Sequence, residues 1–212
     1  MANTANLKIA HGAQSIVSLR RTAASCRACD LWKHATQTVF GEGPQKAKMM
    51  LVGEQPGNKE DLAGRPFVGP AGKLLDDALE KAGIDRGEIY ITNLVKHFKW
   101  EPSESGKTRI GKKLAAGEIQ ACRPWLDAEL KLIKPRIVIL LGATAGQSLL
   151  GKTFRVTRQH GQLIDSSLAP YVLATLHPSA ILRARGKKLR ESQIRSLIHD
   201  LTQANRLLKE AA

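Results

Sequence analysis

The sequence has little cysteine, few aromatic residues and no long apolar run. Only three of its 212 residues are cysteine, an odd number that argues against a disulfide framework. No apolar run reaches the roughly 18–20 residues that a membrane-spanning helix needs, and residues 1–10 lack the charged-then-apolar pattern of a signal peptide. We therefore expect a cytoplasmic protein that has no membrane partner and acts as a monomer.

Acidic residues are also scarce relative to basic ones. Lys and Arg number 33 against 19 for Asp and Glu, so the formal net charge is +14. Such an excess points to a polyanionic partner, most often nucleic acid, although a generally basic proteome gives the same balance. Hydrophobic residues make up 42% of the chain, which is ordinary for a folded domain. We expect one domain over residues 1–212, with residues 1–11 as a flexible N-terminus.

Four short apolar runs alternate with amphipathic helical segments. The runs predict strands at residues 48–53, 88–95, 136–141 and 171–176, and the helices are expected at 70–81, 115–133, 144–150 and 191–209. Apolar strands without alternation, separated by helices, indicate a parallel sheet covered on both faces. The predicted fold is a three-layer αβα domain of the α/β class around a mostly parallel four-stranded sheet.

Residues 96–114 are polar, basic and without a periodic pattern. We expect a functional loop there, because a loop of this length inside a compact domain usually has a function.

Ligands of such sheets bind at the carboxyl ends of the strands, so the residues that follow each strand are the candidates. They are Gly53, Glu54, Gln55, Pro56 and Gly57 after the first strand, Asn93 in the second, and His177 and Ser179 after the fourth. The glycine-containing turn matches neither a Walker loop nor a dinucleotide-binding motif.

Three of the candidate side chains have both a structural and a functional interpretation. Asn93 offers a donor and an acceptor to a planar amide such as a pyrimidine edge, or simply ends its strand. His177 is either a structural hydrogen-bonding residue or a catalytic group. Phe67 lies in a loop rich in Pro and Gly, where it either stacks on a base or anchors the loop in the core.

Cys26 and Cys29 form a C-x-x-C pair. Such a pair can be redox-active, metal-binding or incidental. A thioredoxin-type pair begins a helix after a strand, whereas this pair follows a helical pattern. We favour a metal site, which needs two further ligands.

Five segments of the chain are informative through their sequences and their order: GEQPGNKEDLAGRPFVGPAGKLLDDAL, ITNLVK, ACRPWL, RIVILLGATA and TLHPSAILR. Together they resemble the uracil-DNA glycosylase superfamily and, within it, the iron–sulfur-containing family 4. The motifs GEQPG and VKHF are similar to those of the UdgX group. The resemblance, which extends from Cys26 to about Arg183, implies a DNA repair enzyme that flips deoxyuridine out of DNA. It would hydrolyse the N-glycosidic bond, release uracil and leave an abasic site.

The resemblance also implies roles for the candidate residues. Phe67 would stack on uracil, Asn93 would read its Watson–Crick edge and His177 would stabilise negative charge on its O2. Glu54 and Gln55 would position the attacking water, with Glu60 and Asp61 as weaker candidates. The remaining substrate-binding positions would be Gly53, Pro56, Gly57 and Ser179.

The same resemblance implies a [4Fe–4S] cluster. Its ligands would be Cys26, Cys29, Cys122 and His97, and His97 stands where family 4 has its remaining cysteine. The number and type of these ligands alone would allow zinc equally well.

Two basic segments, 96–113 and 183–195, follow predicted strand ends, and we expect Lys107, Arg109, Arg183 and Arg185 to contact DNA. One departure from the UdgX pattern stands out. That group carries a K-R-R-I-H type loop whose His becomes covalently joined to the abasic sugar, whereas this chain reads KTRIGK, with Gly111 in place of the His. The departure favours a hydrolase that turns over. The alternatives are a uracil-DNA trapping protein with little turnover and a non-enzymatic iron–sulfur module that binds nucleic acid.

Overall fold

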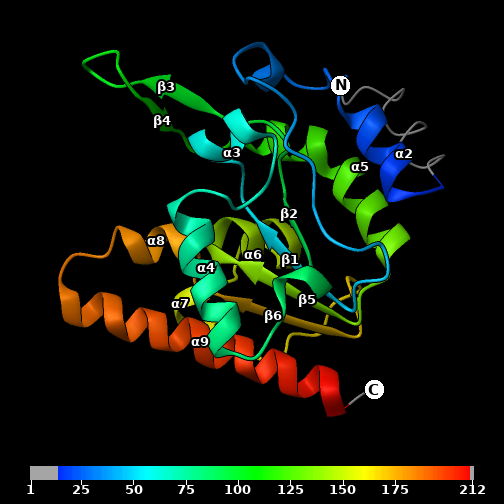
Figure 1. The fold of residues 1–212 in the computed structure, drawn as a ribbon, viewed down its shortest axis with the longest axis vertical. Helices are drawn as coiled ribbons and strands as arrows, with labels where there is room; N and C mark the ends of the chain where they lie inside the picture. Colours follow the sequence, from blue (N-terminus) through cyan, green and yellow to red (C-terminus); the bar gives the residue numbers. More distant parts are fainter. Residues whose placement is uncertain (1–13, 211–212) are drawn as a thin grey trace.

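A four-stranded parallel sheet forms the centre of the computed structural model, which describes residues 14–210 (Figure 1). The strand order is β2-β1-β5-β6. The strands are β1 (Met49–Gly53), β2 (Tyr90–Asn93), β5 (Ile137–Leu141) and β6 (Tyr171–Thr175). Nearly all their residues are buried, which explains why the apolar runs do not alternate. The predicted α/β class and the parallel four-stranded sheet are confirmed.

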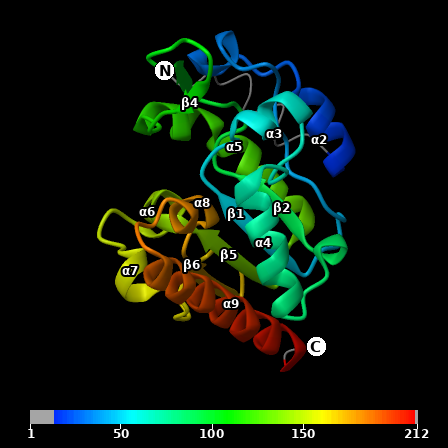
Figure 2. The ribbon, with the colours of Figure 1, turned by 60° about the vertical axis from the view of Figure 1, so that its left-hand side comes forward.

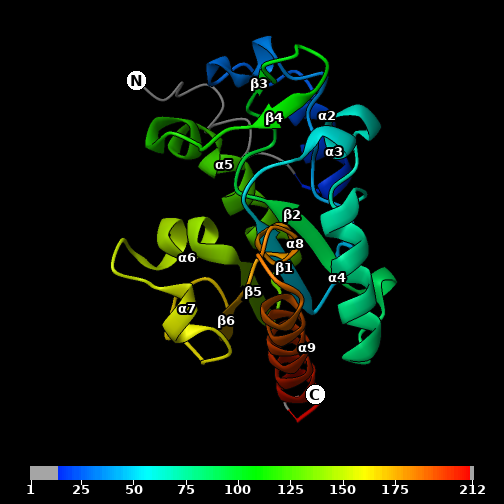
Figure 3. The same ribbon diagram turned by 90° about the vertical axis from the view of Figure 1, so that its left-hand side faces the viewer.

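Helices cover both faces of this sheet, as the edge-on view in Figure 3 shows. The described α-helices are α2 (Ile16–Ala23), α3 (Asn58–Ala63), α4 (Pro70–Lys81), α5 (Ala116–Ile133), α6 (Gly142–Leu150), α7 (Val156–Gln159), α8 (Pro178–Leu182) and α9 (Lys187–Glu210). Side chains of α2, α5 and α6 pack on one face in one core cluster. Those of α4, α8 and α9 pack on the other face, where α9 crosses β6 (Figure 2).

The helix α4 illustrates how local sequence sets these boundaries. Pro70 occupies the first turn, where its missing N–H costs no hydrogen bond. Leu75, Ala78 and Leu79 recur at helical spacing and are buried against the sheet. Gly83 follows the helix with φ +68°, a left-handed conformation that ends helices and that glycine adopts without strain.

The prediction of a loop without secondary structure over 96–114 is wrong in part. The segment contains a short antiparallel hairpin of β3 (Trp100–Pro102) and β4 (Arg109–Gly111). Each strand has three residues, which is too short for an alternating pattern to be recognised. The hairpin projects beyond the carboxyl ends of the main sheet (Figure 1).

Two helix boundaries also differ from the prediction. The helix α9 begins at Lys187 rather than 191, and α6 begins at Gly142 rather than 144. The first turn of α9 is basic and largely exposed, so no apolar periodicity marks its start. The predicted flexible N-terminus, residues 1–11, lies outside the described residues. Across residues 14–210, no helix combines the length and apolar character needed to cross a bilayer.

Candidate active site

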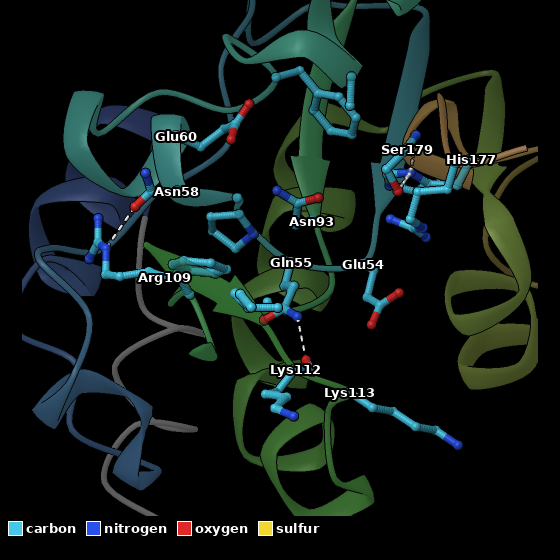
Figure 4. A pocket seen from close by; sticks show the side chains of 18 residues that line it. Glu54, Gln55, Asn58, Glu60, Asn93, Arg109, Lys112, Lys113, His177 and Ser179 are labelled. Carbon is cyan, nitrogen blue, oxygen red and sulfur yellow. Dashed lines mark hydrogen bonds between the residues drawn. The ribbon is translucent and has the colours of Figure 1, made fainter. Parts of the chain in front are cut away.

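A cavity of about 540 Å³ opens at the carboxyl ends of the strands, under the β3–β4 hairpin (Figure 4). Most residues predicted for catalysis, substrate binding or DNA binding line it. They are Glu54, Gln55, Pro56, Gly57, Phe67, Asn93, Arg109, His177, Ser179 and Arg183. Asn58, Phe98 and Lys113 also line the cavity; they lie in the quoted segments and the basic run, but the sequence patterns predict no role for them. The structure therefore brings the candidate residues at the ends of the first, second and fourth predicted strands to one site.

The floor of the cavity depends on a glycine. A Cβ at Gly53 would lie 2.4 Å from Asn93 Oδ1 and 2.7 Å from Phe67 Cζ, so no larger residue fits there without displacing both. Phe67 has φ 54°, which is uncommon for a bulky residue. Its loop packs closely on α4, because a Cβ at Gly72 would lie 1.9 Å from the Phe67 carbonyl oxygen. The ring of Phe67 is thereby fixed 6.0 Å from that of His177, centroid to centroid.

Asn93 presents an unused hydrogen-bond acceptor to the cavity. Its side chain is 2% exposed, and among the described residues Oδ1 has no hydrogen-bond partner. Buried polar atoms are normally paired, and an unpaired one costs free energy. The amide points into the cavity in Figure 4. Its oxygen is therefore available to a ligand that carries an N–H group, as the edge of a uracil ring does.

His177 is built as a neutral hydrogen-bond donor. It caps the N-terminus of α8, and its Nδ1 accepts a 3.1 Å hydrogen bond from the backbone N–H of Ser179. Because Nδ1 accepts, the proton of the neutral ring resides on Nε2. Burial and, to a smaller extent, the charge of Arg183 together lower the pKa of His177 to about 4. The ring can thus donate from Nε2 to a growing anion without being charged itself.

Glu54 and Gln55, predicted together as water-positioning residues, have different surroundings. Gln55 uses both ends of its amide on the hairpin: Nε2 donates to the Lys112 carbonyl at 2.7 Å, and Oε1 accepts from the Lys99 N–H at 2.9 Å. Glu54 is half-buried and lines the cavity. Its carboxylate has no hydrogen bond or ion pair to any described residue. Glu54 is therefore the one of the two that is free to hold a water molecule.

The two weaker candidates, Glu60 and Asp61, are occupied by the fold. Glu60 Oε1 accepts hydrogen bonds from the backbone N–H groups of Val68 and Gly69 at 3.0 and 2.7 Å. Asp61 is fully buried and accepts from the Thr36 N–H at 3.0 Å and from Arg109 Nη1 at 2.7 Å. Both carboxylates hold loops in place around the cavity.

Arg109, predicted to contact DNA, anchors the hairpin to α3 in this structure. Besides its ion pair with Asp61, its Nε donates to Asn58 Oδ1 at 2.7 Å (Figure 4). Its guanidinium also lies over the rings of Phe98 and Trp100, 5.7 and 5.2 Å from their centroids.

Other members of the basic run over 96–113 are also engaged within the chain. Lys96 is buried against Glu129, Lys99 pairs with Glu118, and Lys112 pairs with Glu101. Lys107 and Lys113 are exposed, as are Arg183 and Arg185 in the second run. The number of basic residues facing solvent near the cavity is therefore smaller than the sequence suggests.

The three cysteines gather between α2 and α5. Cys26 and Cys122 are buried and Cys29 is half-buried. Burial raises the pKa of Cys122 to about 12, and the neighbouring thiols of Cys26 and Cys29 contribute in the same direction. His97 directs Nε2 to Thr38 Oγ1 at 3.0 Å. Among residues 14–210, no three or more His, Cys, Asp or Glu side chains are arranged as a metal site.

The fold and the cavity together define an α/β protein with a cavity at its strand ends, lined by the Asn93 amide and by a neutral imidazole donor. Comparison with known proteins identifies the class further. The model of the family described as "Uracil DNA glycosylase superfamily" matches residues 40–202. The chain therefore belongs to the uracil DNA glycosylase superfamily.

Similar proteins within this superfamily are type-4 enzymes. The type-4 uracil-DNA glycosylase of Thermotoga maritima is 37% identical over 186 residues, which cover 87% of this chain and 90% of that protein. That of Sulfurisphaera tokodaii is 36% identical over 203 residues, which cover 85% and 86%. A type-4 enzyme of Pyrobaculum aerophilum is 36% identical over 166 residues, which cover 75% and 80%. The prediction of a glycosylase enzyme is confirmed.

The environment of His177 leads to a testable prediction. In the folded protein its ring should stay neutral until the pH approaches 4, whereas an unfolded histidine takes up a proton near pH 6.5. The unfolded chain therefore binds more protons at this site below about pH 6.5. The contribution of His177 to stability should be lost as the pH falls from there towards 4. Histidine-selective NMR titration, with His177→Ala to assign the resonance, measures this. A midpoint near 6.5 for the assigned ring would contradict the prediction.

Proposed function

We propose that this uracil-DNA glycosylase acts by hydrolysis with multiple turnovers. The observation that carries the proposal is the placement of three groups around one cavity. These are the unpartnered amide of Asn93, the neutral imidazole of His177 and the unpaired carboxylate of Glu54. They are the groups that cleavage of a glycosidic bond to uracil requires: one to read the base, one to stabilise the leaving group and one to serve the sugar.

In the proposed reaction, deoxyuridine is flipped into the cavity and its base stacks on Phe67. The Asn93 amide pairs with the uracil edge, its Oδ1 accepting from N3–H. As the bond between uracil N1 and sugar C1′ breaks, the electron pair moves into the ring, and His177 Nε2–H donates to the charge that develops on O2. The sugar becomes oxocarbenium-like. Glu54 stabilises it, holds the water whose oxygen bonds to C1′, and accepts the proton that this water loses.

Substitution of Glu54 should slow excision without lowering the stability of the protein. Glu54→Gln should slow excision by at least about a hundredfold, the usual scale for losing one acid–base or electrostatic group. Its melting temperature should stay near wild type, because the carboxylate has no partner among the described residues. Single-turnover excision and thermal unfolding measure the two effects. Asp61→Asn is the matched control, because its carboxylate holds Thr36 and Arg109 and its loss should lower stability. Unchanged excision by Glu54→Gln would remove this residue from the mechanism.

We propose that exposed basic side chains contact the DNA backbone. Lys113 and Arg183 lie at the cavity, and Lys107 and Arg185 are exposed on the neighbouring hairpin and loop. Both core clusters pack on one sheet, which supports a single domain. The DNA substrate of the protein supports a cytoplasmic location.

Gly111 supports turnover rather than the trapping known from the UdgX resemblance. It lines the cavity on β4, and a Cβ there would face Phe98 Cε2 at 3.3 Å. A covalent adduct needs a nucleophile within about 3–3.5 Å of the sugar carbon, and glycine supplies none. The position tolerates a side chain if the Phe98 ring shifts by a few tenths of an ångström.

Incubation with an oligonucleotide containing one uracil separates the three candidate functions. The wild type should release several uracils per protein molecule and leave alkali-labile sites. Gly111→His should divert part of this turnover into a protein–DNA species that survives denaturant. Gly111→Ala is the matched control: it adds the same Cβ against the Phe98 ring but supplies no nucleophile, so its product should remain a free abasic site. A stable adduct with wild type would favour the trapping protein, and reversible binding without cleavage would favour the non-enzymatic module.

We propose further that Cys26, Cys29 and Cys122 hold a [4Fe–4S] cluster with His97 as the fourth ligand. The grouping of three thiols fits a cluster, because sulfur is the preferred donor for iron–sulfur centres. Burial lowers the pKa of His97, which favours the neutral imidazole that binds metals, although its ring would have to turn from Thr38. Such a cluster would tie the segment after α2 to α5 and to the end of β2.

Metal analysis tests this assignment independently of activity. The purified protein should be brown and contain about four irons and four sulfides per chain, as this cluster type requires. Cys122→Ala should lose the colour and the iron. A colourless protein with stoichiometric zinc would show that the ligands hold zinc instead.

A further inference from the structure

A buried ion pair lies directly behind Asn93. Lys96 and Glu129 are 1% and 0% exposed in their side chains, and Lys96 Nζ lies 2.6 Å from Glu129 Oε2. Lys96 therefore cannot face DNA, although it begins the basic run of residues 96–113. Apolar residues of similar size often replace a buried ion pair without loss of stability. Stability alone is thus a weak explanation for the pair.

The ammonium of Lys96 has three donors, and all three are used. Besides Glu129, it donates to Thr92 Oγ1 at 2.6 Å and to the backbone carbonyl of Asn93 at 2.8 Å. Glu129 is held from its other side, where Oε1 accepts from Tyr90 Oη at 2.9 Å. The Thr92 hydroxyl, which accepts from Lys96, lies 3.0 Å from the same oxygen of Glu129. Each donor of the ammonium therefore has an acceptor within the network, which holds the ammonium in a single arrangement.

The contact to the Asn93 carbonyl meets a need created by the sheet topology. Strand β2 is at the edge of the main sheet. The N–H of Leu94 donates to the Gly53 carbonyl at 2.9 Å and so points towards β1. In a trans peptide the carbonyl of Asn93 points the opposite way, towards the open edge. Within residues 14–210, no strand accompanies β2 there at Asn93, and Lys96 supplies the missing donor.

We infer that the Lys96–Glu129 pair is a positioning device for Asn93. The peptide that follows Asn93 is held on one side by β1 and on the other by Lys96, so the base of its side chain has little freedom. A group that reads a base must be held to within about 0.5 Å, and Asn93 Oδ1 makes no contact of its own that would do this. The inference rests on the proposed role of Asn93 in reading uracil.

The double variant Lys96→Met/Glu129→Leu tests the inference because it removes both charges and retains similar volume. Its melting temperature and iron content should remain near wild type. Its kcat/KM on uracil-containing DNA should fall by about tenfold or more, the scale expected from a small misplacement of a binding group. Inhibition by free uracil should weaken by a similar factor. In an Asn93→Ala background the same double substitution should have little further effect, because the residue it positions is gone.

Tyr90→Phe is the matched control. It removes one hydrogen bond to Glu129 without touching Lys96 or Asn93, and inhibition by free uracil should be unchanged. Should the double variant fail to fold, Lys96→Met/Glu129→Gln keeps an acceptor for Tyr90 and Thr92, and the same losses are expected.

Two outcomes would overturn the inference. One is an equal loss of kcat/KM in the Asn93→Ala background, since the pair would then act on the whole site rather than through Asn93. The other is failure of both pair variants to fold while Tyr90→Phe folds, since the pair would then serve stability alone. A wild type that binds free uracil but excises none from DNA would contradict the proposed function and leave the positioning role to be read from the uracil inhibition.

Discussion

The parallel pairing of β1 with β2 is the constraint on which the site depends. The register sets Gly53 opposite Asn93. Beyond the end of β2, the N–H groups of Leu94 and Val95 donate to the carbonyl oxygens of Gly53 and Glu54. The two motifs that follow these strands, 40 residues apart in the chain, therefore leave the sheet side by side. The absence of a side chain at Gly53 then lets Asn93 and Phe67 meet at the floor. His177 joins them because β6 is parallel to the other strands.

The β3–β4 hairpin is the second part of the site, and polar contacts from separate elements suspend it over the cavity. Gln55 bonds the backbone at its base, the Asp61–Arg109 pair ties β4 to α3, and Trp100 Nε1 donates to the His34 carbonyl at 2.8 Å. Because Gln55 and Arg109 also line the cavity, the position of the hairpin depends on residues of the cavity that it covers.

Sequence patterns were sufficient to predict the fold and to select residues at the floor of the cavity. Four apolar runs predict the sheet, and the rule that ligands bind at strand ends selects Glu54, Asn93 and His177. The β3–β4 hairpin over the cavity could not be predicted, because three-residue strands carry no periodicity. The roles of Arg109 and Lys96 were also hidden, because a charged residue in a basic run reads as solvent-exposed unless its buried partner is known. Asp61 and Glu129 are those partners, and both lie far away in sequence.

The glycines of the cavity differ in how much change they permit, which matters for redesigning base selectivity. At Gly53 an added methyl group would collide with the Asn93 amide and with the Phe67 ring. At Gly111 the nearest obstacle is the edge of one aromatic ring. A change of substrate range by evolution or engineering is therefore restricted at Gly53, on the floor of the cavity, and permitted at Gly111, on the hairpin above it. New chemistry can be introduced from the hairpin while the packing of Gly53, Phe67 and Asn93 stays intact.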